Sequence, residues 1–494
     1  MVVAVQRGSA PAAPRRGLVP RGLGVLLVLV TIIGVAWALL VPPWQTPDEL
    51  NHFAYAQSLA ESFTLPGAPG RLPVSADISF ADGAVGAGRG AFFPRFSPPV
   101  WSRAAAAEYA ARESGSDPLS RTNGGGATNA STNPPLYYLF AAIGTWIDHG
   151  GTAFGRLYTT RLLGVVLLLL TTTAAWLLAG EVFARRRLAQ LLCAATVGLL
   201  PMATFMSTSV NPDALLMTTW TFALWLGARV INRAAQRVDA VALCAVTAAA
   251  ILVKATSYAL VAPALLALLL GWRRRPREER RHAAGHLTLA VGVLLAPVLA
   301  WVALAPGLGG TTLTSVSSGG HAFNVRQFLS YVWQFYLPRL PFLTPLQTWP
   351  DLAVWHVWLR GGLGTFGWLD VSLAPWIYAV AGIAIGGIGV AVVILLVRRR
   401  SPGAGALLAF FALCLVALLG LLHITEYRVL IGGGGPFLQG RYLLPLVSLF
   451  GLAVGLVGGH LPIRVRAPAA VLVLVVLLTL QVASLGAVAQ AYYL

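Results

Sequence analysis

Long apolar runs constrain this chain more than any other feature of its sequence. Several of them reach about 20 residues, the length that an α-helix needs to cross the hydrocarbon core of a bilayer. Of the 494 residues, 57% are hydrophobic and only 11% are charged, whereas soluble domains carry roughly 25% charged residues. The sequence therefore predicts an all-α protein that crosses a membrane many times.

Eleven apolar runs are expected to span the membrane, and at most thirteen. The first run, 22–41, is long for the apolar part of a signal peptide and ends without a clear cleavage site, so we interpret it as a retained anchor. The other expected spans are 157–180, 187–206, 211–231, 238–254, 256–272, 286–306, 373–397, 404–423, 441–459 and 468–490.

Polar segments divide the chain into four regions. We expect a disordered, cytoplasmic N-terminus over 1–21 and a first transmembrane module over 22–306, which includes a long outer loop at 42–156. An outer, aromatic-rich loop over 307–372 and a last group of transmembrane helices over 373–494 should follow.

Two short helices are predicted inside the outer loop. Residues 48–63 should form a helix that lies near the membrane surface. Residues 134–147 are apolar, but a helix of about 14 residues is short for a membrane span and suits an interfacial or re-entrant helix.

Membrane topology explains the net charge of +18. If the N-terminus is cytoplasmic, the inner loops hold 21 of the 35 basic residues and four of the 17 acidic residues, which accounts for +17. Arginine-rich short loops face the cytoplasm in membrane proteins. We therefore predict a multi-pass membrane protein with a cytoplasmic N-terminus, membrane lipids around it and no nucleic-acid partner. The bias for arginine over lysine and the richness in alanine, glycine and valine indicate a bacterial cytoplasmic membrane. Placing 134–147 across the membrane would move the later arginine clusters outside, so this helix is expected not to cross.

A pair of carboxylates stands where the first span leaves the membrane. Asp48, Glu49 and His52 follow directly on the apolar run and its two prolines. Ionisable groups at such a boundary are costly to keep dry, and they mark functional sites by default. The alternative is a solvated loop in which Thr46 or Asp48 caps a helix over 49–60.

Cations collect on the same outer side of the membrane. Lys254, the single lysine of the chain, lies at an outer turn and is either a snorkelling side chain or a compact charge for a phosphate. Arg441 stands at the outer mouth of a span and suits a phosphate group, and Arg161 and Arg428 lie on the same side. The run Gly432 to Gly435 resembles an anion-binding nest. Acids beside cations could hold a lipid-linked phosphate and deprotonate an acceptor next to it.

These residues resemble a known superfamily. Pro47-Asp48-Glu49 with His52-Phe53 and the later segment Asn133-Pro134-Pro135-Leu136-Tyr137-Tyr138 resembles the GT-C membrane glycosyltransferases over about residues 22–460. The combination is similar to a bacterial branch known only as predicted membrane proteins. The further segments that carry this similarity are Asn211-Pro212-Asp213, Lys254 to Tyr258, Phe366-Gly367-Trp368-Leu369-Asp370 and Gln439-Gly440-Arg441-Tyr442.

The resemblance implies a GT-C-like fold and transfer of a sugar from a polyprenyl-phosphate-linked donor to an envelope glycan, lipid or protein. Carried over by position, Asp48 would be the general base of an inverting transfer, and Glu49 its partner or a metal ligand if a divalent cation takes part. We infer that the donor phosphate meets Arg441, Lys254, Arg161 and Arg428. The expected substrate-binding residues are His52, Asn133, Tyr137, Tyr138, Asn211, Asp213, Tyr258, Trp368, Asp370, Gln439 and Tyr442.

Two other functions stay open from the sequence. One is a transporter or flippase of lipid-linked sugars, although transporters place charges near the bilayer midplane in repeated, broken helices, and here the acids lie at span ends without a visible repeat. The other is a non-catalytic scaffold for envelope assembly, which predicts that Asp48 and Glu49 can be lost without consequence.

Overall fold

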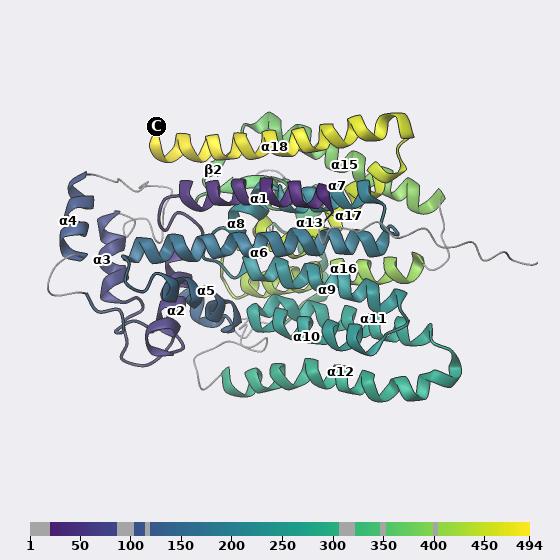
Figure 1. Ribbon diagram of the computed structural model, residues 1–494, viewed down its shortest axis with the longest axis horizontal. Helices are drawn as coiled ribbons and strands as arrows, with labels where there is room; N and C mark the ends of the chain where they lie inside the picture. The colour runs from purple at the N-terminus through teal and green to yellow at the C-terminus, as the bar shows by residue number, and fades with distance from the viewer. Residues whose placement is uncertain (1–19, 86–102, 114–118, 306–321, 346–351, 399–403) are drawn as a thin grey trace, which may run out of the picture.

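The computed structural model describes residues 20–85, 103–113, 119–305, 322–345, 352–398 and 404–494. Apart from one hairpin of two strands with two residues each, the regular elements in these ranges are helices. Most of the long helices run side by side in one bundle (Figure 1). The predicted all-α, polytopic architecture is confirmed. The expected N-terminal region 1–21 lies outside the described residues except for its last two positions, as do 307–321 and 346–351 of the expected loop.

Nine helices in the described ranges are long and apolar enough to cross a membrane. They are α1 (Arg21–Leu40), α6 (Ala153–Val182), α9 (Asp213–Asn232), η4 (Ala255–Leu260) continued by α11 (Val261–Arg273), α12 (Arg277–Leu304), α15 (Pro375–Arg398), α16 (Ala404–Ile431), η8 (Gly440–Leu446) continued by α17 (Val447–His460), and α18 (Ile463–Tyr493).

A bent pair, α7 (Arg187–Gly198) and α8 (Pro201–Ser207), makes a tenth candidate span. The two helices meet at 59° because Pro201 lacks the N–H that a continuous helix needs and holds Leu200 in an extended conformation. The expected span 238–254 is α10 (Arg237–Val253), whose 17 residues rise about 25 Å, slightly less than the roughly 30 Å of a hydrocarbon core. Length and composition thus support nine or ten spans, fewer than the eleven expected.

The long outer loop gathers at one end of the molecule, with the end of α1 and the start of α6 (Figure 1). It contains α2 (Glu49–Ser62), α3 (Ala76–Ala84), α4 (Arg103–Glu113), η3 (Asn129–Thr132) and α5 (Leu136–Ile147). The 12 residues of α5 rise about 18 Å, too little to cross a bilayer. The expected position of 48–63 near the membrane surface stays a prediction. Most of α2 is buried in the protein, because it packs against α5 and contributes to the main core.

Two buried charges anchor this loop. Arg156 near the start of α6 donates to Asp77 of α3 at 2.5 Å, and Gln57 of α2 donates to the same carboxylate oxygen at 2.9 Å. Arg156 is fully buried, so the pair ties α2, α3 and α6 into one unit. A buried arginine deprived of its partner would cost several kcal/mol, roughly 3–5. No local sequence pattern indicates this pair, because its members lie 79 residues apart.

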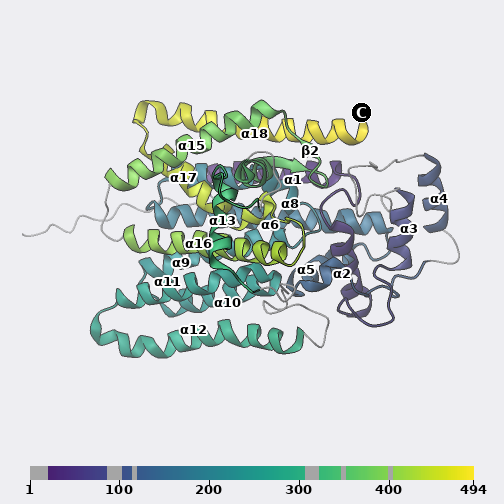
Figure 2. The ribbon, with the colours of Figure 1, turned by 180° about the vertical axis from the view of Figure 1, so that it is seen from behind.

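The described part of the expected loop 307–372 contains regular structure. It holds α13 (Val325–Tyr336), the π-helical segment η7 (Trp355–Arg360), α14 (Gly361–Gly364) and the antiparallel strands β1 (Thr365–Phe366) and β2 (Val371–Ser372). In the view of Figure 2, α13 lies over the bundle next to α16. Phe366 contacts the rings of Trp37 and Phe205 at 4.9 and 5.4 Å between centroids, which joins the hairpin to α1 and α8.

Candidate active site

Four charged side chains meet at the end of the bundle that carries the outer loop. Asp48 follows α1, Asp213 begins α9, Lys254 follows α10 and Arg441 lies in η8 just before α17. We call these four residues the acid–cation cluster. Each stands at a helix end, so segments far apart in the sequence bring their charges to one place.

The cluster has a buried centre and an open side. Lys254 Nζ donates to Asp213 Oδ1 at 2.6 Å, and Arg441 Nη2 donates to Asp48 Oδ2 at 3.2 Å. Arg441 Nε lies 3.9 Å from Asp213 Oδ2, an ion pair without a hydrogen bond. The side chains of Asp213 and Arg441 are 2% and 4% exposed, whereas those of Asp48 and Lys254 are 34% and 20% exposed. A ligand from outside would therefore meet Asp48 and Lys254 first.

Several polar atoms of the cluster are buried and incompletely bonded. Arg441 Nε and Asp213 Oδ2 have no hydrogen-bond partner among the described residues, and neither does Oε1 of the adjacent Gln439. Buried polar atoms in native proteins are nearly always paired, and an unpaired one calls for an explanation such as a ligand. The cluster thus keeps donors and acceptors that are covered by protein and have no hydrogen-bond partner among the described residues.

The backbone at Asp48 is strained. Its φ of 62° lies in the left-handed region, which costs about 1–2 kcal/mol for most residues other than glycine, although aspartate tolerates it better. Asn211 Nδ2 donates to the carbonyl of Pro47 at 3.1 Å and helps to hold this turn. The carboxylate of Asp48 makes no capping bond to α2, and Oγ1 of Thr46 is buried without a partner, so the capped-loop alternative is wrong.

Glu49 has a different environment from its neighbour Asp48. Both of its oxygens accept from Arg161, at 2.8 Å from Nε and 2.5 Å from Nη2, and Oε1 also accepts from the Val210 amide at 3.1 Å. The remaining guanidinium hydrogens bind the carbonyls of Ala38, Val41 and Pro42. Both side chains are fully buried.

This geometry corrects two expected roles. Arg161 has no free face for a phosphate, because all of its nitrogens are engaged with Glu49 and the exit of α1. Glu49 does not fit a metal site with Asp48, because its oxygens already bind a cation and an amide. Within the described ranges, no three His, Cys, Asp or Glu side chains come together in a way that could hold a metal ion.

A neutral histidine borders the cluster. His52 Nδ1 lies 2.8 Å from the Tyr138 hydroxyl, which also accepts from Asn133 Nδ2 at 3.2 Å. Because that hydroxyl can then donate its own hydrogen to Nδ1, the network places the imidazole proton on Nε2. Burial lowers the pKa of His52 to about 4, with Asp48 opposing the shift and Lys254 and Arg441 adding to it. Burial also raises the pKa of Tyr138 well above its usual value.

The structure sorts the other expected site residues. Tyr442 joins the cluster, with Lys254 Nζ 5.0 Å and Arg441 Cζ 5.4 Å from its ring centroid. Tyr137 is buried beside Asn211. Trp368 reaches the same end through a hydrogen bond of 2.9 Å from Nε1 to the carbonyl of Trp44.

Three expected residues make no hydrogen bond or ion pair with the cluster in the described ranges. Tyr258 packs against the main core, and Asp370 is exposed at the turn between β1 and β2. Arg428 is exposed in the last turn of α16 and has no hydrogen-bond or ion-pair partner in the described part of the chain. The run Gly432 to Gly435 follows the end of α16, where Gly434 N donates to the carbonyl of Val429. An anion nest there is disfavoured because a helix C-terminus carries partial negative charge.

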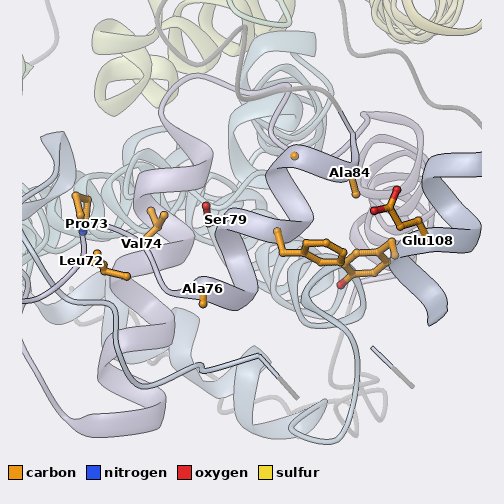
Figure 3. A pocket seen from close by; sticks show the side chains of 10 residues that line it. Leu72, Pro73, Val74, Ala76, Ser79, Ala84 and Glu108 are labelled. Carbon is orange, nitrogen blue, oxygen red and sulfur yellow. The ribbon is translucent and has the colours of Figure 1, made fainter. Parts of the chain in front are cut away.

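A separate cavity of about 690 Å³ lies in the outer loop between α3 and α4 (Figure 3). Its lining includes Leu72, Val74, Phe80, Glu108 and Tyr109. None of its lining residues belongs to the acid–cation cluster, so we do not assign it to the candidate site.

The chain matches one family model. The model is described as "Predicted membrane protein (DUF2142)", and it matches residues 31–450. This agrees with the branch of predicted membrane proteins that the sequence motifs indicated. No curated protein matches the chain.

Solved structures align with the chain at low identity. ArnT from Cupriavidus metallidurans is 14% identical in the apo state, with a TM-score of 0.45 over 90% of this chain and 61% of ArnT. ArnT bound to undecaprenyl phosphate is 13% identical, with a TM-score of 0.46 over 96% of this chain and 76% of that one. AglB, the archaeal oligosaccharyltransferase from Archaeoglobus fulgidus, in complex with an inhibitory peptide and a dolichol-phosphate, is 13% identical, with a TM-score of 0.44 over 96% of this chain and 56% of AglB.

This chain thus spans less than two thirds of the apo ArnT and AglB chains. With TM-scores below 0.5, these alignments do not establish a shared activity, donor or acceptor.

The first prediction concerns the buried pair. Glu49→Gln should lower the free energy of unfolding by about 3–5 kcal/mol, because it leaves the Arg161 guanidinium buried without its counter-charge. Thermal unfolding of the purified protein in detergent measures the loss. Glu278→Gln, which changes an exposed carboxylate on α12, serves as the control and should have almost no effect. Equal stability of the two variants would contradict a structural role for Glu49.

The second prediction concerns His52 and pH. Its folded pKa of about 4 lies below the ordinary value of 6.5, so the unfolded chain binds more protons between these values. The stabilisation is complete above pH 6.5 and falls as the pH drops toward 4. From pH 7 to pH 5 the loss is about 2 kcal/mol. His52→Gln should show a smaller drop in melting temperature over that interval than the wild type, and an equal drop would refute this assignment.

Proposed function

This chain belongs to the DUF2142 family of predicted membrane proteins, and we propose that it is a GT-C-type glycosyltransferase of the bacterial cytoplasmic membrane. It moves a sugar from a polyprenyl-phosphate-linked donor to an envelope glycan, lipid or protein. One observation carries the proposal: Asp48 is a partly exposed carboxylate in a strained backbone, next to a buried guanidinium with an unpaired donor. Such strain persists where function requires it.

Asp48 is the general base in this proposal. Its free oxygen accepts the proton of an acceptor hydroxyl while the hydroxyl oxygen attacks the anomeric carbon of the donor sugar. The bond between that carbon and the phosphate oxygen breaks, and the phosphate leaves with the electron pair. Attack opposite to the leaving phosphate inverts the anomeric centre. No second acid is needed, because a phosphate is already a good leaving group.

Arg441 and Lys254 stabilise the departing phosphate. Arg441 offers Nε, which has no hydrogen-bond partner, and Nη2, which Asp48 shares at 3.2 Å. A phosphate oxygen at Nη2 would take the place of Asp48 and free that carboxylate to act as a base. Lys254 is one-fifth exposed and adds a second charge beside the ring of Tyr442. Cations placed where negative charge develops are among the strongest catalytic devices of enzymes.

Neighbouring residues set the geometry of the base. Asn211 bridges the carbonyl of Pro47 and the amide of Asp213, at 3.1 and 3.0 Å, and thereby couples both acids of the cluster. His52, Tyr138 and Asn133 form a neutral wall that adds no competing charge. Gln439 lies two residues before Arg441, and its buried amide oxygen has no hydrogen-bond partner among the described residues.

The site is assigned to the outer face of the membrane, with the N-terminus in the cytoplasm. The arginine-rich ends of the helices lie opposite the outer loop along the bundle: α12, for example, starts at Arg277 on the end away from α2 to α5 (Figure 1). The cluster lies at the outer-loop end, where α10 finishes at Lys254.

Loss of the base gives the central prediction. Asp48→Asn should reduce transfer from a radiolabelled polyprenyl-phosphate sugar pool to envelope acceptors by about 10²–10⁴-fold, the range for a general base. Membranes with matched amounts of folded protein provide the measurement. Glu278→Gln, which also neutralises an exposed carboxylate but at the far end of the bundle, should leave the rate unchanged. Unaltered transfer in Asp48→Asn would remove the base and favour a transporter or a scaffold.

Cysteine labelling tests the orientation. Cys193, Cys244 and Cys414 are buried, so the native chain gives a low background. In intact spheroplasts, a membrane-impermeant maleimide should label Ser79→Cys in the exposed part of α3. It should label Glu278→Cys at the start of α12 only after the membrane is opened. The reverse pattern would place the cluster in the cytoplasm.

A further inference from the structure

A second buried polar network lies next to the candidate site. Trp358 Nε1 donates to the Tyr336 hydroxyl at 3.1 Å, and that hydroxyl lies 2.9 Å from His423 Nε2. On the other side of the ring, His423 Nδ1 lies 2.9 Å from the Tyr331 hydroxyl, which donates to Glu426 Oε2. We call these five residues the Glu426 network. It joins α13 and η7 to α16, and the proposed chemistry does not use it.

The hydrogen bonds of this network run in one direction. Because Tyr331 gives its single hydrogen to Glu426, it can only accept from His423, which therefore carries its proton on Nδ1. His423 Nε2 is then an acceptor, and Tyr336 donates to it while accepting from Trp358. Each donor has one acceptor. The charge on Glu426 therefore determines the direction of donation in every hydrogen bond of the network.

Glu426 also holds the segment that leads to Arg441. Its second oxygen, Oε1, accepts from the amides of Phe437 and Leu438, both at 3.0 Å. The carboxylate is only 2% exposed, and hydrogen bonds to a buried charge are about twice as strong as neutral ones. These amides precede Gln439 and Arg441 by a few residues, so Glu426 fixes the start of η8.

A close contact between glycines holds the segment 437–440 at a second point. The backbone of Gly440 lies against Gly361 and Gly362 so closely that a Cβ there would overlap their atoms. Only glycine allows this approach of η8 to α14. Between the Glu426 bonds and this contact, the backbone just before Arg441 is held at two points, while Gly432, Gly433 and Gly434 before it are exposed.

We propose that Glu426 is a positioning residue for the donor phosphate. Through the amides of Phe437 and Leu438 it sets the path of Gln439 and Gly440, and thereby aims the Arg441 guanidinium at Asp48 and at the phosphate. This inference rests on the proposed function. Tyr331 maintains the orientation of the carboxylate by donating to Oε2, and His423 Nδ1 holds the Tyr331 hydroxyl in turn.

Binding of undecaprenyl phosphate to the full chain in lipid nanodiscs tests the inference. Arg441→Gln and Glu426→Gln should each weaken binding at least tenfold. Tyr331→Phe should weaken it about threefold, and it replaces Glu426→Gln if that variant does not fold. Asp239→Asn is the matched control: it removes a buried, ion-paired carboxylate at the opposite end of α10 and should change binding less than twofold.

The two hypotheses fail in different ways. If Arg441→Gln binds the lipid phosphate as tightly as the wild type, the phosphate role of the cluster is wrong and the positioning role falls with it. If Arg441→Gln weakens binding while Glu426→Gln and Tyr331→Phe leave it unchanged, only the positioning role is overturned. A loss with Asp239→Asn equal to that with Glu426→Gln would show general destabilisation and would also overturn it.

The tautomer of His423 gives a readout that simple destabilisation would not change. In ¹⁵N-histidine NMR of the folded protein, with His423→Asn identifying the resonance, the wild type should carry the proton on Nδ1. In Glu426→Gln, the amide hydrogens would donate to Tyr331, whose own hydrogen would turn to His423 Nδ1 and move the imidazole proton to Nε2. An Nε2 proton in the wild type, or no change in the folded variant, would refute the directional network.

Discussion

The buried ion pair between Glu49 and Arg161 is the interaction on which the end of the molecule that carries α2 to α5 depends. It joins the exit of α1 to α6 and, through the Val210 amide, to the start of α9. Removing two charges from water is costly, and the cost is recovered only when every hydrogen bond is made, as it is here. The turn that follows α1 is therefore fixed, and Asp48 is held in its left-handed conformation beside Arg441.

Two adjacent carboxylates consequently have opposite properties. Glu49 is fully buried and fully bonded, whereas Asp48 is one-third exposed and shares a single guanidinium nitrogen. One stabilises the fold and the other is available for chemistry. The cluster around Asp48 balances two acids against two cations, so it tolerates burial. Arg441 Nε and Asp213 Oδ2 lie 3.9 Å apart as an ion pair, and neither makes a hydrogen bond among the described residues.

Sequence patterns predicted correctly those features that depend on local composition or on position at the end of an apolar run. Apolar runs located the membrane helices. The polar residues at the ends of these runs included Asp48, Asp213, Lys254 and Arg441, which the structure brings into one cluster. The same patterns failed for Arg161, because the sequence around a charge at a helix end does not show whether that charge faces a ligand, a buried acid or solvent. The pairs Arg156–Asp77 and Tyr331–Glu426 were missed because their members lie 79 and 95 residues apart.

The sequence by itself determined an all-helical membrane protein with carboxylates and cations at the ends of its spans, because length, hydropathy and position in the chain are local quantities. Only the tertiary structure decided which acid pairs with which cation. Hydrogen-bond saturation depends on distances of a few ångströms between segments that no local pattern relates. The division of labour between Glu49 and Asp48, and the network that links Trp358 to the segment before Arg441, are results of packing.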